Sequence, residues 1–193
     1  MGDLRVEPAS QIQDTPVYIK ALAANSYVVP GVNFDTVGNS GVMVADTIYY
    51  QPIFVPTPDT FDRIAIQITL QRAASSGRLG IYGNSGNSPG ALIVDAGAID
   101  TTAVGIKAPV INVTLQRGLY WLAYIVSDSL IEEEYFLPCS MPFYQHHATL
   151  FTAISVGTLS KGGQAAQLAG LSDPAVAPDA INGPWCVRLR RST

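Results

Sequence analysis

The sequence predicts an all-β fold: an antiparallel β-sandwich of the jelly-roll type with an extended N-terminal arm. Three observations predict it. Apolar and polar residues alternate over much of the chain, glycine- and proline-rich turns separate the alternating stretches, and no segment has the period of a long helix. Short strands divided by such turns are typical of sandwiches and barrels. About eight strands with long irregular connections favour a jelly roll over an up-and-down barrel.

The first 40 residues show no sustained hydrophobic period. They contain Pro8, Pro16 and Pro30, and residues 33–41 are a loop-like run rich in glycine and asparagine. We therefore expect residues 1–40 to form an extended arm for attachment or oligomer contacts, and residues 41–193 to form the jelly-roll domain. The polar N-terminus lacks the apolar stretch of a secretory signal, and no window is apolar for long enough to span a bilayer. We expect no membrane insertion.

Residues 63–70 give the clearest strand, because isoleucine or leucine stands at every second position from Ile64 to Leu70. Such alternation predicts a strand with one dry and one wet face. Residues 118–126 are apolar at both odd and even positions, so both faces of a strand there would be apolar. We therefore expect a central strand that is covered on both sides. The C-terminal strand should return to pair near the start of the sandwich. Further strands are expected at residues 78–83, 91–99, 109–116, 148–156 and 185–191.

Proline and glycine positions add local expectations. Pro52 and Pro56 flank a stretch that we expect to be a short edge strand, since proline cannot complete a hydrogen-bond ladder. Gly80 should leave room for a neighbouring aromatic ring, either Tyr120 or Trp121. Flanking glycines limit the one candidate helix to two turns at most, and it lies at residues 163–171.

The chain carries few charges. Only 13% of its 193 residues are charged, about half the ~25% that is usual in globular proteins, and the net charge is -4. There is no basic excess to attract nucleic acid, so we expect no nucleic-acid partner. Interface cores are depleted in charged residues. This composition favours a component of an assembly over a free monomeric enzyme.

Several short pieces stand in a fixed order between residues 48 and 126. They are YYQPIFVP at 49–56, FDRIAI at 61–66, RLGIY at 78–82, SPGALI at 88–93, DAG at 95–97 and GLYWLA at 118–123. In this order and spacing they resemble a module of tailed-bacteriophage virion proteins. The resemblance implies a β-sandwich with a topology similar to carbohydrate-binding modules, as found in phage tail, fibre and capsid-decorating proteins.

The resemblance also implies a role and a location. We expect a structural component of the virion, assembled in the host cytoplasm, which acts by contacts with other virion proteins and with copies of itself, most often as a trimer. Residues 1–40 and the last 40 residues match nothing in this resemblance. The alternative is a host-receptor or carbohydrate-binding module at the virion surface, with a host surface glycan as partner.

Aromatic side chains are the candidate contacts for a glycan. The chain has 9 tyrosines, 2 tryptophans and 6 phenylalanines, most of which a β-sandwich would place in its core. The candidates are Tyr49, Tyr50, Tyr82 and Tyr144, whereas we expect Trp121 to be buried. Basic residues at the C-terminus are the candidate contacts for an acidic partner or subunit, with a solvated tail as the alternative: Arg188, Arg190 and Arg191.

No pattern in the sequence indicates catalysis or metal binding. His146 and His147 are the only histidines, and neighbours in a strand point to opposite faces, which disfavours a shared metal. Cys139 and Cys186 are expected to be free thiols, with a structural disulfide between them as the alternative. Residues 132–134 are three glutamates that we expect in an acidic loop, without the spacing of a calcium loop.

The remaining acids and serines give no better candidate for an active site. Asp62, Asp95 and Asp100 could supply the carboxylates of a glycosidase, but no spacing selects them. There is no Gly-x-Ser-x-Gly elbow for a serine nucleophile. We therefore expect no catalytic residue, no metal and no cofactor, and predict that the chain is not an enzyme.

Overall fold

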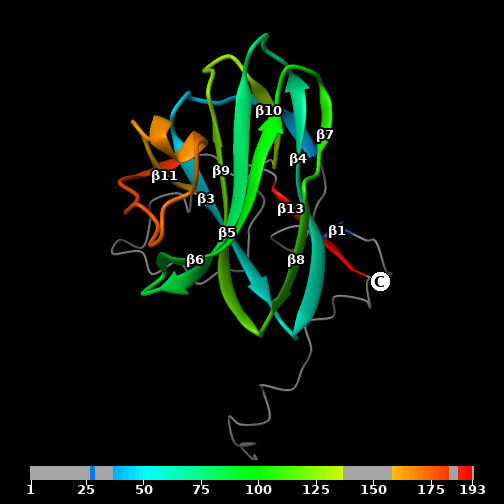
Figure 1. The fold of residues 1–193 in the computed structure, drawn as a ribbon, viewed down its shortest axis with the longest axis vertical. Helices are drawn as coiled ribbons and strands as arrows, with labels where there is room; N and C mark the ends of the chain where they lie inside the picture. Colours follow the sequence, from blue (N-terminus) through cyan, green and yellow to red (C-terminus); the bar gives the residue numbers. More distant parts are fainter. Residues whose placement is uncertain (1–26, 29–36, 137–157, 183–186, 193) are drawn as a thin grey trace, which may run out of the picture.

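The computed structural model describes residues 27–28, 37–136, 158–182 and 187–192 of the chain. In these residues nearly all regular structure is β-strand, and every strand pair is antiparallel. The only helix in this part is the short 3-10 helix η2, Ala165–Leu168, within the segment predicted to hold two helical turns at most. The all-β prediction is thus confirmed (Figure 1).

The first sheet is built around β4, its longest strand. One path through the sheet runs β1-β13-β4-β10-β2, and β7 and β8 pair with β4 as well. Because β8 and β13 overlap in their register on β4, they must lie on its opposite sides. The strands of this sheet are β1 (Tyr27–Val28), β2 (Val37–Val42), β4 (Asp59–Leu70), β7 (Gly105–Lys107), β8 (Val110–Leu115), β10 (Glu132–Phe136) and β13 (Arg188–Arg191).

The second sheet has β9 between β3 and β5, in the order β12-β11-β3-β9-β5-β6. The central place predicted for residues 118–126 is therefore confirmed, since β9 is Gly118–Val126. The other strands of this sheet are β3 (Ile48–Val55), β5 (Ser76–Ser85), β6 (Ser88–Asp100), β11 (Thr158–Lys161) and β12 (Ala180–Asn182).

A single hydrophobic core joins the two sheets. Alternate residues of β4, such as Ile64, Ile66 and Ile68, belong to the same buried cluster as alternate residues of β9. Within it the rings of Tyr49 and Tyr124 stack with centroids 5.0 Å apart. Burying one large aliphatic side chain, such as that of Ile64, contributes about 1.5–3 kcal/mol. The cluster therefore supplies most of the driving force that holds one sheet against the other.

The second sheet also buries its outer face. Every second residue of β9, namely Trp121, Ala123 and Ile125, belongs to a separate apolar cluster with residues of β3 and β5. The cover is residues 162–179, which connect β11 to β12 and which we call the cover segment (orange in Figure 1). It contributes Leu168, Leu171, Ala175 and Val176. The predicted burial of residues 118–126 on both sides is therefore confirmed.

The structure corrects three local expectations. The stretch between Pro52 and Pro56 is not a separate short strand, because it is the end of the eight-residue β3. It does lie at an edge as expected, since within the described residues Pro52–Val55 pair only with β9, whereas β11 reaches only Ile48–Tyr50. The expected acidic loop at residues 132–134 is the start of β10, between β4 and β2. The loop-like run at residues 33–41 contains the first residues of β2, because backbone pairing does not require strand-forming side chains.

The two ends of the described chain meet in the first sheet. β13 pairs with β4, so the C-terminal strand does return to pair with an early strand, as predicted. On its other side β13 pairs with Tyr27–Val28, and β2 begins at Val37. Parts of residues 1–40 therefore belong to a sheet, whereas the predicted strand at residues 148–156 lies outside the described residues.

Gly80 makes close contact with the cover segment rather than with Tyr120 or Trp121. A Cβ atom built on Gly80 would lie 2.7 Å from the backbone oxygen of Val94 and would also overlap the side chain of Leu171. The expectation of an aromatic neighbour was wrong because the sequence does not show that the cover segment folds back onto β5.

We predict that Gly80→Ala lowers the free energy of unfolding by about 1–3 kcal/mol, because the backbone oxygen of Val94 must move to admit a methyl group. Chemical denaturation of the purified protein measures the change. Gly83→Ala is the matched control in the same strand, since its nearest atoms would be 3.7 Å from the new methyl group. Equal effects of the two substitutions would contradict the close packing at Gly80.

Candidate functional site

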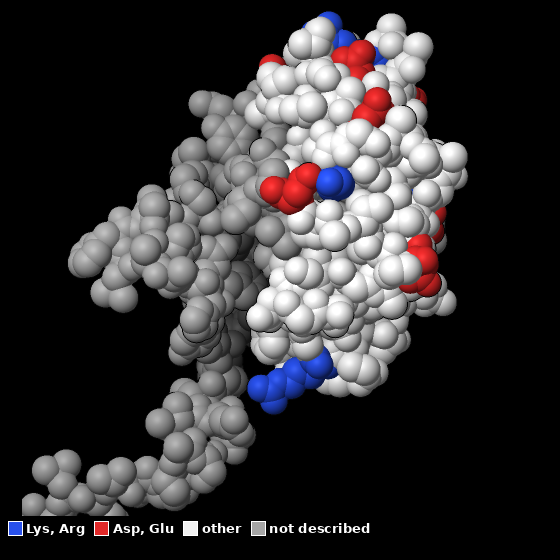
Figure 2. Space-filling model, turned by 90° about the vertical axis from the view of Figure 1, so that its left-hand side faces the viewer, with Lys and Arg blue, Asp and Glu red and all other residues white. Residues whose placement is uncertain are grey.

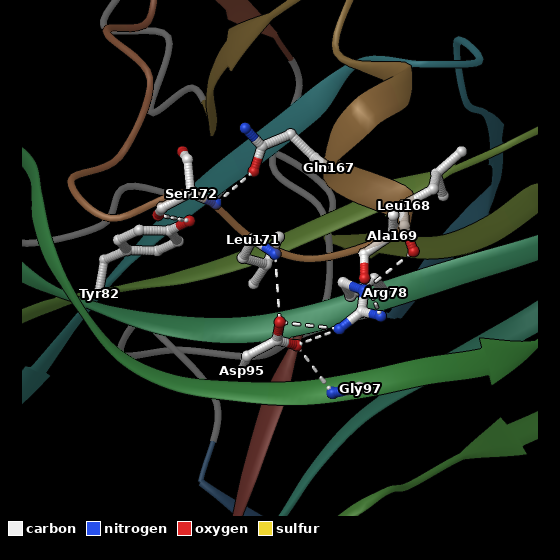
Figure 3. A network of polar contacts seen from close by, with 9 residues as sticks. All are labelled: Arg78, Tyr82, Asp95, Gly97, Gln167, Leu168, Ala169, Leu171 and Ser172. Carbon is white, nitrogen blue, oxygen red and sulfur yellow. Dashed lines mark hydrogen bonds and ion pairs between the residues drawn. The ribbon is translucent and has the colours of Figure 1, made fainter.

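Arg78 fastens the cover segment to the outer face of the second sheet. It lies in β5, on the same face as Gly80 and Tyr82. Its Nε donates to the backbone oxygen of Leu168 at 3.0 Å and its Nη2 to that of Ala169 at 2.9 Å. These carbonyls end η2, where a cation is favoured. The guanidinium group thus satisfies two of the carbonyls that the short helix leaves open (Figure 3).

Asp95 of β6 completes this attachment. Both of its oxygens accept hydrogen bonds from Arg78 Nη1, at 2.7 and 2.8 Å. Asp95 also accepts from the backbone N–H of Leu171 at 3.1 Å and from that of Gly97 at 2.9 Å. Both members of the ion pair, Arg78 and Asp95, therefore form hydrogen bonds with the backbone of the cover segment.

The rest of the cover segment is held by neutral hydrogen bonds. The hydroxyl of Tyr82 donates to the backbone oxygen of Ser172 at 2.9 Å, and the N–H of Ser172 donates to the side-chain oxygen of Gln167 at 2.7 Å (Figure 3). Two further bonds reach the edge of β6. The N–H of Leu92 donates to Asp173, and the N–H of Ala175 donates to the oxygen of Gly90.

The cover segment therefore also protects part of a sheet edge. β6 is the last strand of its sheet within the described residues. Exposed edge strands present free N–H and C=O groups that can pair with another chain. Along residues 90–92 two of these groups are occupied, which makes this half of β6 a poor site for strand addition by another copy.

Burial and hydrogen bonds shift the pKa values of two tyrosines and one aspartate in this region. Burial raises the pKa of Tyr82 to about 12 and also raises that of Tyr50. Partial burial opposes ionisation of Asp95, but hydrogen bonds from Arg78, Gly97 and Leu171 and the charge of Arg78 outweigh it and lower the pKa of that carboxyl. Acids and bases that work in catalysis have pKa values near the working pH. This network is suited to holding structure, not to moving protons.

The tyrosines proposed as glycan contacts are inside the molecule. Tyr49, Tyr50 and Tyr82 are at most 2% exposed, Tyr49 in the core between the sheets and the other two beneath the cover segment. They present no ring face to a sugar, and this part of the prediction is corrected. Trp121 is buried as expected, with its indole N–H bonded to Asn84. Tyr144 lies outside the described residues.

The C-terminal arginines make ion pairs within the chain. Arg190 binds the carboxylate of Asp62 with Nε at 2.9 Å and Nη2 at 2.6 Å, and Arg191 pairs with Asp59. The hydrogen bond from Arg190 is the main reason that the pKa of Asp62 is lowered. Arg188 lies on the same strand, paired in register with Ala65. The structure thus gives Arg190 and Arg191 acidic partners in β4. The contact of Arg188, Arg190 and Arg191 with an acidic partner or subunit stays a prediction.

The other candidate residues do not assemble into a reactive site. Asp62, Asp95 and Asp100 are bonded to different groups, Asp100 to the backbone and hydroxyl of Thr102. Among the described residues no cluster of three potential metal ligands occurs. The described part of the chain also has no helix that could span a bilayer. Five residues that the sequence analysis considered lie outside the described residues. They are the two cysteines, the two histidines and one residue of the predicted C-terminal strand: Cys139, Cys186, His146, His147 and Trp185.

The outer surface of the first sheet carries an apolar patch that the sequence analysis missed. Nine large apolar side chains of the described chain are well exposed, and six of them lie in or beside β2, β4, β7 and β10. We call these six the end patch: Val42, Val44, Leu70, Val104, Ile106 and Leu130. Each is between 38% and 58% exposed. Alternation in the sequence marks apolar positions but does not show which side of a strand stays uncovered.

Charges are sparse on other faces too. The side of the molecule drawn in Figure 2 is mostly uncharged, with acidic and basic residues far apart or in pairs of opposite sign. Lys161 and Asp179 also form an ion pair, with Nζ and Oδ2 2.6 Å apart. The low charge content read from the sequence is therefore visible as a largely neutral surface.

Comparison of the sequence with protein-family models and with curated proteins found no match.

We predict that Arg78→Met lowers the free energy of unfolding by about 2 kcal/mol, because it keeps the apolar stem and removes the charged hydrogen bonds that hold the cover segment. Urea denaturation followed by circular dichroism measures the change. Lys161→Met is the control, since its ion pair with Asp179 is more exposed and should contribute less than about 1 kcal/mol. A loss for Arg78→Met no greater than that of the control would show that the network does not fasten the segment.

Proposed function

We propose that this chain is a structural component of a tailed-bacteriophage virion, a tail, fibre or capsid-decorating protein whose two sheets form a jelly-roll sandwich. It acts by protein–protein assembly and performs no reaction. The observation that carries the proposal is the end patch, because several exposed apolar side chains in and beside neighbouring strands of one sheet are typical of contact sites. The resemblance of residues 48–126 to virion modules supplies the biological setting.

The chemistry of the described residues supports a binding role. The polar network at Arg78 holds the cover segment in place, and its hydrogen bonds lower the pKa of the Asp95 carboxyl. The low charge of the whole chain agrees with a surface that is covered by other subunits, since interface cores are poor in charge. Neither feature requires a substrate or a cofactor.

The proposal includes partners and a location. Copies of the chain form a closed homo-oligomer, with a trimer as the form that the resemblance implies, and this oligomer joins other virion proteins in the host cytoplasm. The residues before β1 provide the attachment. Burial of Tyr49, Tyr50 and Tyr82 weakens the alternative of a glycan- or receptor-binding module, which keeps only Tyr144 of its four tyrosines.

We predict that the chain co-purifies in fixed stoichiometry with particles of the virus that encodes it, and that a variant lacking residues 1–26 folds but no longer joins them. The truncation is chosen because β1 begins at Tyr27 and both sheets are retained. Density-gradient purification and mass spectrometry measure the association, and circular dichroism checks the fold. Absence of the full chain from particles would overturn the proposed function, whereas normal attachment of the truncated chain would overturn the role of the arm alone.

A further inference from the structure

Two carboxylates bind the cover segment to the second sheet, one from each side of the contact. Asp95 of β6 accepts from the backbone N–H of Leu171 in the cover segment at 3.1 Å. Asp173 of the cover segment accepts from the N–H of Leu92 in β6 at 2.9 Å. Arg78 joins the first carboxylate to the carbonyls that end η2 (Figure 3). Hydrogen bonds to a carboxylate are strong only while it is ionised, so this attachment depends on the protonation of acids.

The cover segment lacks the backbone ladder that holds a strand in a sheet. β13 also makes ion pairs with β4, but it is held there by backbone pairing in register as well. Residues 162–179 contain η2 and no strand. The backbone N–H of Ala175 donates to the oxygen of Gly90 at 2.8 Å, whereas the bonds at Arg78 and Asp95 each involve a side chain. Loss of side-chain bonds therefore loosens the cover segment before it loosens the sheets.

Arg78 makes the attachment sensitive to the charge of Asp95. The side chain of Arg78 is only 14% exposed, and a guanidinium group stays charged at every accessible pH. Protonation of Asp95 removes the counter-ion from this largely buried cation. An ion pair that loses one member is destabilising, because the remaining charge is poorly solvated. Opening of the cover segment would return water to Arg78.

The groups that surround Asp95 supply no second cation. Apart from Asp95, the ionisable side chains of β5, β6 and the cover segment are Arg78, Tyr82, Asp100, Asp173 and Asp179. Tyr82 stays neutral below its pKa of about 12. Asp179 pairs with Lys161 of β11, outside this group. Arg78 is therefore the one base in these three elements that balances the carboxylate of Asp95.

The direction of the pH dependence follows from the contacts of Asp95. Partial burial opposes its ionisation, but hydrogen bonds from Arg78, Gly97 and Leu171 hold the pKa of this carboxyl below its ordinary value of 3.8. A carboxyl with a lowered pKa stabilises the folded contact in its ionised form. That stabilisation is present above pH 3.8 and is lost as the pH falls through the lowered pKa. Acid therefore favours the open cover segment.

We propose that the cover segment is an acid-released lid, which is closed at neutral pH and leaves the outer face of the second sheet when Asp95 is protonated, while both sheets stay folded. Its release uncovers the aromatic side chains of Tyr50, Tyr82 and Trp121. It also frees the edge of β6 at residues 90–92. The closed lid hides both surfaces from other molecules. This inference goes beyond the proposed assembly function and does not depend on it.

Amide hydrogen exchange of the full chain at pH 6 and at pH 3, read by NMR and corrected for the intrinsic rates, tests the proposal. At pH 6 the N–H groups of Leu171 and Ser172 should be protected as strongly as those of β9. At pH 3 their protection should fall about tenfold or more, because charged hydrogen bonds are lost, while β9 keeps its protection. Asp95→Asn should lower the protection of Leu171 and Ser172 already at pH 6 and should remove the change between the two pH values.

Asp62→Asn is the matched control. The hydrogen bond from Arg190 lowers the pKa of Asp62 too, but this pair lies in the first sheet, away from the cover segment. The pH effect at Leu171 and Ser172 should persist in this variant.

The unmodified chain alone can overturn the proposal, so the test does not depend on the folding of a variant. Protection of Leu171 and Ser172 that is unchanged at pH 3 would contradict the lid. Loss of their protection together with that of β9 would mean that acid unfolds the whole molecule, and would contradict it as well. A pH effect that survives in Asp95→Asn, or that Asp62→Asn removes equally, would show that Asp95 is not the group that releases the segment.

Discussion

The second sheet of this protein is apolar on both faces, and each face needs a cover. One face packs against the first sheet. The other would expose Trp121, Ile125 and neighbouring tyrosines to water if the cover segment were absent. Strands without a polar face occur only where both sides are buried, and here the chain itself provides the second cover. The polar network at Arg78 follows from this constraint, because an irregular segment on a sheet must have its own backbone groups satisfied.

The two sheets therefore meet their partners in different ways. The outer face of the second sheet is closed by its own chain, and part of the β6 edge is closed with it. The first sheet keeps apolar side chains on its outer surface near β2 and β7.

Periodicity in the sequence was sufficient to predict most of the strands that build the core. The alternation in residues 63–70 and the apolar run in residues 118–126 were interpreted correctly, because each pattern has one dominant cause, burial on one face or on both. The sequence could not identify what covers the second sheet, since the short candidate helix at residues 163–171 does not show which surface residues 162–179 pack on. For the same reason the sequence does not show that Tyr50 and Tyr82, two candidate glycan contacts, lie beneath that segment. β2 was missed because its residues are mostly glycine and small polar side chains, and its place is set by pairing with β10.

Amide hydrogen exchange of the full chain, resolved by residue, tests most directly whether the cover segment is an integral layer. The N–H groups of Leu171 and Ser172, which bond to Asp95 and Gln167, should exchange as slowly as those of β5 and β9. Slow exchange of both sets would mean that they open only when the sheet opens. Fast exchange at Leu171 and Ser172, with β9 still protected, would contradict the account. It would mean that the outer face of the second sheet opens to water while both sheets remain folded.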